Sequence, residues 1–201
     1  MERPKLLIIA GPNGSGKTTV TSQILKHEWI EGCEYINPDI IAQDKYGDWN
    51  SQEIILKAAQ FAEKQREKCL ENHNSLIFET VLSAPDKIDF IQRAKKQDYF
   101  IRLFFIGTDS PQINALRVAQ RVMHGGHDVP IQKIISRYYK SIANCILISK
   151  VVDRLYVYDN SIENGLTELL FRANEGKFVK QYAQMHDWAR LIYENTLINN
   201  Q

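Results

Sequence analysis

One octapeptide, Gly11–Thr18 (GPNGSGKT), restricts the fold of this 201-residue chain more than any other segment. It matches the pattern G-x-x-x-x-G-K-[ST], and it stands between an apolar run, Lys5 to Ala10, and a stretch with helical character, Thr18 to Glu28. In a strand–loop–helix setting, glycines let backbone N–H groups turn inward around a phosphate, and the helix N-terminus adds positive potential. The motif therefore predicts a phosphate-binding loop of a P-loop NTPase.

The same motif predicts how a nucleotide and its metal are held. We expect Lys17 to reach the β- and γ-phosphates and the Thr18 hydroxyl to bind Mg²⁺, so the expected ligands are ATP and Mg²⁺. The residues expected to contact the nucleotide are Gly11, Pro12, Asn13, Gly14, Ser15, Gly16, Lys17, Thr18 and Thr19.

Strand-like and helix-like segments alternate along most of the chain. This alternation predicts an α/β fold with a five-stranded parallel sheet flanked by helices, because parallel strands need crossover connections. The expected strands are Lys5 to Ala10, Glu34 to Ile36, Ser75 to Phe78, Tyr99 to Ile106 and Arg154 to Tyr158. A small hairpin (169–173 and 177–180) and a helix (187–197) should follow, and no linker divides residues 1–201, which we expect to form a single domain.

Composition excludes several classes of protein. Twenty-five Lys and Arg against twenty-four Asp and Glu give a net charge of +1, so no global attraction to nucleic acid or to an anionic membrane is expected. Three widely spaced cysteines rule out a disulfide scaffold. With no CxxC pair among them, they also argue against a structural zinc site. The first apolar run is too short for a signal peptide or a membrane span. These features predict a soluble, cytoplasmic protein.

Carboxylates at the tips of two predicted strands favour a kinase acting on a small molecule. The chain has no Asn-Lys-x-Asp tetrapeptide, which guanine-specific proteins usually carry, so a GTPase is less favoured. The chain is also short for a mechanical ATPase. Asp39 could accept the proton of an attacking hydroxyl, although it could instead only cap the following helix. Glu79 could bind Mg²⁺ or a substrate hydroxyl, or could be an exposed strand-end carboxylate.

Arginines follow in a predicted helical hairpin at about 110–150. Arg117 and Arg121 share a helix face, and Arg137 lies on the next helix. Such a hairpin could act as a lid that brings positive charge onto the transferred phosphate and excludes water. The alternative is an ordinary solvated basic face.

Several of these motifs together resemble the zeta-toxin-like small P-loop kinases, over roughly residues 5–175. The resemblance rests on Gly11–Thr18, Asn37-Pro38-Asp39, Phe78-Glu79-Thr80, Arg117 to Val122, Gly125 to Pro130, Arg137-Tyr138 with Ser141 and Asn144, and Tyr158 to Ser161. It implies a sheet of the nucleoside-kinase type, ATP and Mg²⁺ as ligands, UDP-N-acetylglucosamine as phosphate acceptor and a helical antitoxin as protein partner.

Residue by residue, the resemblance implies roles that agree with the motifs. Lys17, Asp39, Arg121 and Arg137 would be catalytic; Asp39, Glu79, Thr80 and Arg117 would bind substrate; Thr18 and Glu79 would hold the metal. Ser83 stands where the larger toxins carry a substrate-binding arginine, and the chain has little beyond the core domain. Both departures bear on the sugar-nucleotide acceptor and leave the kinase chemistry intact.

Other functions fit parts of the sequence. The acceptor could be a nucleoside or a polynucleotide 5′-hydroxyl, or the chain could be an ATP-binding regulator that works through a protein partner. The turn Asp159–Ser161 is expected beside the adenine base, or it is an ordinary turn. The expected partner is a small-molecule phosphate acceptor. Binding to a membrane or to nucleic acid is not expected.

Overall fold

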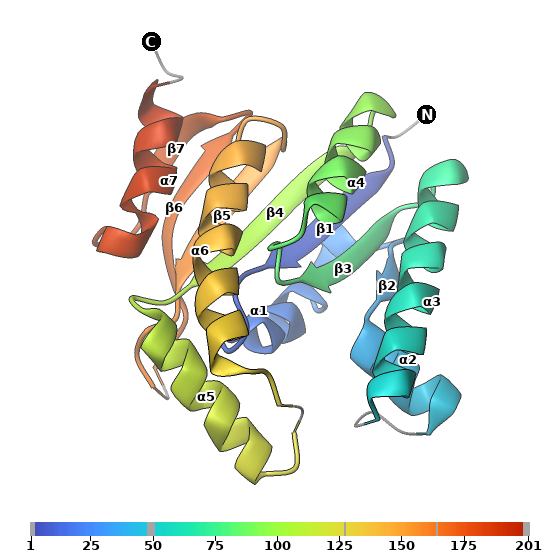
Figure 1. The fold of residues 1–201 in the computed structure, drawn as a ribbon. Helices are drawn as coiled ribbons and strands as arrows, with labels where there is room; N and C mark the ends of the chain where they lie inside the picture. The colour runs from blue at the N-terminus through green and yellow to red at the C-terminus, as the bar shows by residue number, and fades with distance from the viewer. Residues whose placement is uncertain (1–2, 48–50, 127, 164, 199–201) are drawn as a thin grey trace.

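A seven-stranded sheet runs through the middle of the molecule (Figure 1). The computed structural model describes residues 3–47, 51–126, 128–163 and 165–198. In chain order, the elements are β1 (Lys5–Ala10), α1 (Lys17–Ile24), the 3-10 helix η1 (Glu28–Ile30), β2 (Glu34–Ile36), α2 (Pro38–Tyr46), α3 (Gln52–Glu71), β3 (Leu76–Thr80), α4 (Pro85–Lys96), β4 (Phe100–Gly107), α5 (Pro111–Met123), α6 (Ile131–Ile148), β5 (Arg154–Asp159), β6 (Glu168–Asn174), β7 (Lys177–Gln181) and α7 (Asp187–Ile198).

The five expected parallel strands are confirmed, but the sheet is wider than predicted. Its strand order is β2-β3-β1-β4-β5-β6-β7, and all pairs up to β5 are parallel. The predicted hairpin, β6 and β7, continues the same sheet in antiparallel orientation. The open edge of β5 offers backbone N–H and C=O groups that need partners, and β6 supplies them, so the result is one mixed sheet of seven strands.

The central strand β1 explains why the fold closes around the phosphate-binding motif. Leu6, Leu7, Ile8, Ile9 and Ala10 are completely buried, since β1 pairs on both edges and is covered on both faces. Alternate side chains of β1 enter two different hydrophobic clusters. One contains residues of α3, α4, α6 and α7, and the other contains residues of α1 and η1.

The sequence allows a helix after the Asn37–Asp39 turn but does not give its bounds; the structure shows it as α2, and local chemistry accounts for its start and end. The Asn37 side chain accepts a hydrogen bond from the backbone N–H of Asp39, Pro38 occupies the first helical position, and Gly47 ends the helix in a left-handed conformation (φ 70°). These are ordinary start and stop signals for a helix. The predicted helix at 18–28 is shorter than expected, because it ends at Ile24 and η1 follows.

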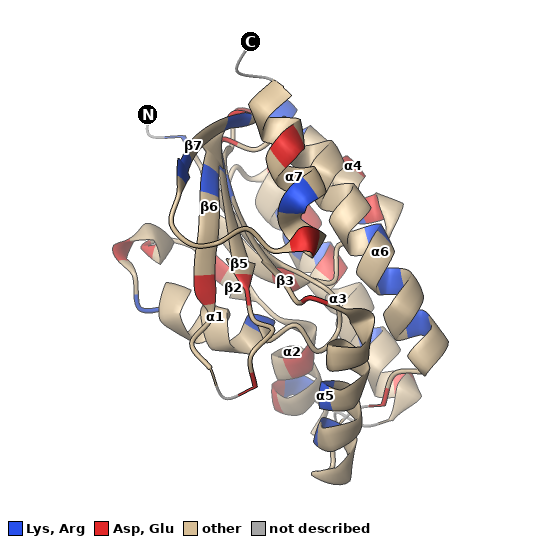
Figure 2. Cartoon of the chain, turned by 90° about the vertical axis from the view of Figure 1, so that its left-hand side faces the viewer, with Lys and Arg blue, Asp and Glu red and all other residues tan. Residues whose placement is uncertain are grey.

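Helices α4, α6 and α7 lie on one side of the sheet in Figure 2. Helix α1 lies on the other side and reaches only part of that face. None of the helices in the described part of the chain is long and apolar enough to cross a membrane.

Candidate active site at the carboxyl edge of the sheet

The phosphate-binding loop follows β1 and depends on two glycines that no other residue could replace without strain. Gly14 has φ 76° and Gly16 has φ 87°, in the left-handed region. A Cβ on Gly14 would lie 2.5 Å from the backbone oxygen of Asn114, and one on Gly16 would lie 2.1 Å from the Asn160 side-chain nitrogen. The loop is therefore both conformationally restricted and closely packed, which preserves the concave row of N–H groups that the motif predicts.

Lys17, at the start of α1, folds back over this loop. Its ammonium group donates hydrogen bonds to the carbonyl oxygens of Gly11 (2.9 Å) and Pro12 (3.0 Å). The pKa of Lys17 is lowered to about 8, mainly by burial; the nearby cations Arg121 and Arg137 contribute to this lowering, and the carboxylates Glu79 and Asp39 oppose it. The amine therefore lies among two cationic and two anionic side chains, in the region where the motif places the phosphates.

The loop residues fit a bound nucleotide and metal. The Ser15 hydroxyl is completely buried and has no hydrogen-bond partner among the described residues, so it is an unused polar group inside the loop. Thr18 is exposed and lines the cleft next to Lys17, as does Glu79 across from it. Hydroxyl and carboxylate oxygens are suitable ligands for Mg²⁺. Thr19 is exposed but does not line the cleft.

The two predicted carboxylates come from neighbouring strands and have different surroundings. Asn37 acts as the N-cap of α2, which leaves the Asp39 carboxylate exposed at the cleft instead of capping the helix. Glu79 accepts a hydrogen bond from the Tyr35 hydroxyl (2.7 Å), and the Asn37 amide donates to that hydroxyl (2.8 Å). Burial and the bond to Glu79 raise the pKa of Tyr35, so this hydroxyl stays a donor that fixes one oxygen of Glu79.

The loop after β3 is held in an unusual conformation by a distant helix. The Leu82 backbone donates to the Thr80 hydroxyl (3.0 Å), and Leu82 has φ 57° although it is not a glycine. From α6, the Ser141 hydroxyl donates to the Val81 carbonyl (2.7 Å) and the Asn144 amide donates to the Leu82 carbonyl (2.8 Å). Helix α6 therefore fixes the wall of the cleft to which Thr80 and Val81 belong.

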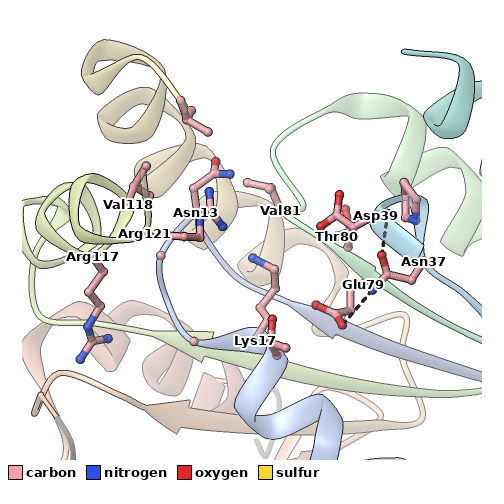
Figure 3. A pocket seen from close by; sticks show the side chains of 15 residues that line it. Asn13, Lys17, Asn37, Asp39, Glu79, Thr80, Val81, Arg117, Val118 and Arg121 are labelled. Atoms are coloured by element: carbon pink, nitrogen blue, oxygen red, sulfur yellow. Dashed lines mark hydrogen bonds between the residues drawn. The ribbon is translucent and has the colours of Figure 1, made fainter. Parts of the chain in front are cut away.

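The three predicted arginines take different positions. Arg121, on α5, lines the cleft, and Arg137, on α6, donates from its guanidinium to the Asn13 side-chain oxygen (3.3 Å). Arg117 also lines the cleft, but its guanidinium donates to the backbone oxygens of residues 160–162, with the shortest bond, 2.7 Å, to Asn160. In Figure 3, Arg117 and Arg121 lie on one side of Lys17 and Asp39, Thr80 and Glu79 on the other.

The helical hairpin of α5 and α6 has a small core of its own. Val118, Val129 and Ile134 form a buried cluster separate from the two clusters at the sheet. This cluster joins α5 to the start of α6, and α6 in turn is attached to the loops after β4 and β3 through hydrogen bonds of Tyr138, Ser141 and Asn144. His127, part of the Gly-Gly-His motif, lies outside the described residues.

Together these elements line a cleft of about 460 Å³, open to solvent, at the carboxyl ends of β1, β2 and β3. This is the edge where open α/β sheets bind ligands. The Asn160 turn lies beside the phosphate loop, since the Asn160 amide donates to the Ser15 carbonyl (2.9 Å).

Some residues of the cleft were not predicted as site residues. Asn37 lines the cleft next to the β2 tip, and Tyr35, two positions earlier, contacts Asn37 and the cleft residue Glu79. The alternation with Ile36 could have indicated that Tyr35 and Asn37 share a face. Ser141 and Asn144 lie three positions apart on α6, but their partners Val81 and Leu82 are about 60 residues away, which no local pattern reveals.

A family model described as "Zeta toxin" matches residues 1–167. The chain belongs to the zeta toxin family. An uncharacterized protein of Haemophilus influenzae is 27% identical to this chain over 138 residues. These residues cover 67% of this chain and 92% of the Haemophilus influenzae protein.

Solved structures agree with this family member in fold. The AvrRxo1-ORF1:-ORF2 complex with ATP matches 96% of this chain and 64% of the other, with 18% identity and a TM-score of 0.68. The structure of the PezAT toxin–antitoxin system of Streptococcus pneumoniae matches 100% of this chain and 88% of its own chain, with 15% identity and a TM-score of 0.60. A chain of the Pnkp1/Rnl/Hen1 RNA repair complex matches 72% of this chain and 46% of its own length, with 19% identity and a TM-score of 0.55. This zeta toxin family member thus spans about two thirds of the AvrRxo1 chain and most of the PezAT chain.

Proposed function

We propose that this protein is an ATP-dependent kinase that transfers the γ-phosphate to a hydroxyl group of a small metabolite. The observation that supports this most strongly is the cleft itself, in which Lys17, Thr18, Asp39, Glu79 and Arg121 all line one space. A phosphate-binding loop, a carboxylate available as a base and a cation for the transferred group are the parts that phosphoryl transfer requires. The proposed domain is the whole of residues 1–201, with a lid at about 110–150.

In the proposed mechanism the two halves of the cleft have separate tasks. The loop from Gly11 to Thr18 binds the phosphates of ATP through its N–H groups and the Lys17 ammonium. Asp39 accepts the proton of the acceptor hydroxyl as its oxygen attacks, and Glu79, oriented by Tyr35, binds the acceptor or the metal shell. Arg121 and Arg137 stabilise the charge on the transferred group. Mg²⁺, held by Thr18 and Glu79, would neutralise phosphate charge when bound.

The residues around Asp39 favour an acceptor with several hydroxyl groups. Asn37, Glu79 and Thr80 offer amide, carboxylate and hydroxyl groups at the β2 and β3 tips. UDP-N-acetylglucosamine is the first acceptor to test, because of the family, and a protein antitoxin is the proposed partner. The AvrRxo1 and PezAT structures are complexes with a second protein or a toxin–antitoxin system, which supports the search for such a partner.

The test is a transfer assay with purified protein, ATP and Mg²⁺, using UDP-N-acetylglucosamine next to a panel of nucleosides, sugars and a 5′-hydroxyl oligonucleotide. Mass spectrometry would follow the phosphorylated product, with Asp39→Asn as the control. Product formed by the wild type alone supports both the kinase and its base. Transfer to another panel member retains the kinase and changes the acceptor. ATP binding with no transfer to any acceptor contradicts the proposal and favours an ATP-binding regulator.

A further inference from the structure

The sheet has one face that is covered by helices only in part. Among the described residues of β6 and β7, only Leu169 packs against the hydrophobic cluster on the side where α1 lies, and Figure 2 shows Lys and Arg on both strands. By strand register, the cations on this face are Arg102, Arg154, Arg172, Lys177 and Lys180, which we call the basic face. They come from four adjacent strands, β4 to β7.

Strand register puts these cations directly beside one another. Arg102 pairs with Arg154 across β4 and β5, and Arg172 pairs with Lys180 across β6 and β7. Lys177 pairs with Asn174, which in turn pairs with Arg154. Like charges in opposite positions destabilise a sheet, so these pairs are unfavourable for folding alone.

The basic face lacks compensating acidic partners. In the described parts of the chain, none of its five cations forms an ion pair with a carboxylate. The Nε atoms of Arg102 and Arg172 are buried without a hydrogen-bond acceptor. Buried donors without partners cost free energy, so these arginines are unfavourable for folding alone, and an anionic ligand over the face would relieve the repulsion between the like charges.

Aromatic rings alternate with these cations. The Arg102 guanidinium lies between the rings of Trp29 (4.8 Å) and Phe100 (4.7 Å), and the Lys180 ammonium lies 4.9 Å from the Tyr182 ring. Tyr182 is 46% exposed. Tyr158 is partly exposed on the same face of β5 as Arg154.

We propose that the basic face binds single-stranded nucleic acid. A flat sheet that presents cations for phosphates and aromatic or guanidinium planes for bases is the arrangement that single strands require. The face spans three inter-strand steps, about 15 Å, which accommodates a few nucleotides. An acidic protein segment would satisfy the charges but would make no use of the exposed Tyr182 ring, so the single strand is the occupant that the observations favour.

This binding is separate from the proposed kinase reaction. None of the five cations lines the cleft that contains Lys17 and Asp39. The face can therefore bind its ligand whether or not the acceptor assay succeeds, and saturating ATP should leave the binding unchanged.

The test is fluorescence anisotropy of labelled 20-mers of oligo(U) and oligo(dT) with the full chain at several salt concentrations. If four phosphates are neutralised, the logarithm of the association constant should fall with the logarithm of salt with a slope of about −3. The variant Lys177→Gln/Lys180→Gln, in exposed positions, should reduce this slope by about 1.4. The matched control is Lys133→Gln/Lys140→Gln on α6, which removes the same charge from exposed positions elsewhere and should leave the slope unchanged.

A second variant separates stacking from charge. Tyr182→Ala should weaken binding roughly 5-fold or more with no change of slope, since stacking contributes affinity without releasing counterions. Equal loss in both double-lysine variants overturns the proposal. So does binding of a poly-glutamate 20-mer without binding of either oligonucleotide, which would assign the face to an acidic protein segment. A preference between oligo(U) and oligo(dT) would distinguish RNA from DNA.

Discussion

The two halves of the cleft are built in different ways. The phosphate half is one continuous segment, Gly11–Thr18, whose shape depends on backbone conformation at Gly14 and Gly16. The acceptor half is assembled from side chains on the β2–α2 turn, the β3 tip and helix α6. Changes in the phosphate half should therefore affect mainly nucleotide binding, and changes in the acceptor half mainly transfer to the acceptor. The predictions below test this division.

The largest effect should come from Asp39→Asn, which removes the proposed base without changing its size. We expect the rate of phosphoryl transfer to fall by about 10² to 10⁴, because that is the usual contribution of general base catalysis. ATP affinity, measured by calorimetry, should stay within about twofold, since Asp39 belongs to the acceptor half. Asp44→Asn, an exposed position on the same helix, is the matched control and should leave both quantities unchanged. A parallel loss of ATP affinity in Asp39→Asn would break the division.

A change in the phosphate half should have the opposite signature. Gly14→Ala places a Cβ 2.5 Å from a backbone oxygen at φ 76°, so we expect ATP affinity to fall at least tenfold. Gly47 has a similar φ, 70°, but in Gly47→Ala no described residue would lie within 4 Å of the new Cβ. It should cost only about 1 to 2 kcal/mol of unfolding free energy, with ATP affinity retained. Equal ATP affinities for the two variants would show that close packing of the loop is unimportant.

The pKa of Lys17, about 8, predicts a pH dependence of nucleotide binding. The charged ammonium binds phosphate, and above pH 8 the free protein loses this proton, so ATP affinity should fall by up to about tenfold per pH unit. Lys17→Arg keeps its charge throughout and should remove this dependence, whatever its affinity at pH 7. Calorimetry between pH 7 and 9.5 would measure both proteins. The same pH slope in Lys17→Arg would assign the titration to another group.

The smallest effect should follow Tyr35→Phe, which deletes the hydroxyl that orients Glu79. Loss of one such hydrogen bond, worth about 0.5 to 1.5 kcal/mol, should raise the KM for the acceptor several-fold. Steady-state kinetics with the acceptor found by the transfer assay would measure it, and the KM for ATP should not move. Tyr139→Phe on α6, 61% exposed, removes the same atom at the surface and should change neither constant.

The phosphate half could be predicted from the sequence because its information is local. The motif, the preceding apolar run and the following helix are contiguous, and a parallel sheet follows from the alternation of strands and helices. The acceptor half could be predicted only as a set of residues. Asp39 and Glu79 were expected at strand tips. The hydrogen bonds of Tyr35 with Glu79 and Asn37, and the bounds of helix α2, were not predicted.

Long-range pairing explains the remaining differences. The hairpin of β6 and β7 was predicted from its turn, but nothing in its own sequence specifies that it pairs with β5. In the structure, Ala173 and Phe171 of β6 pair with Leu155 and Val157 of β5. Likewise, Arg117 was expected at the substrate, and its bonds to residues 160–162 depend on how the two segments meet. The net charge of +1 is an average that says nothing about the clustering of cations on one face.

Helix α6 has a thermodynamic consequence for the proposed reaction. Near its N-terminal end Arg137 contacts the phosphate-binding loop through Asn13, and one to two turns further on Ser141 and Asn144 hold the loop that follows β3. A displacement of this one helix therefore alters both binding subsites together. We expect ATP and the acceptor to bind cooperatively, and by reciprocity each must change the dissociation constant of the other by the same factor.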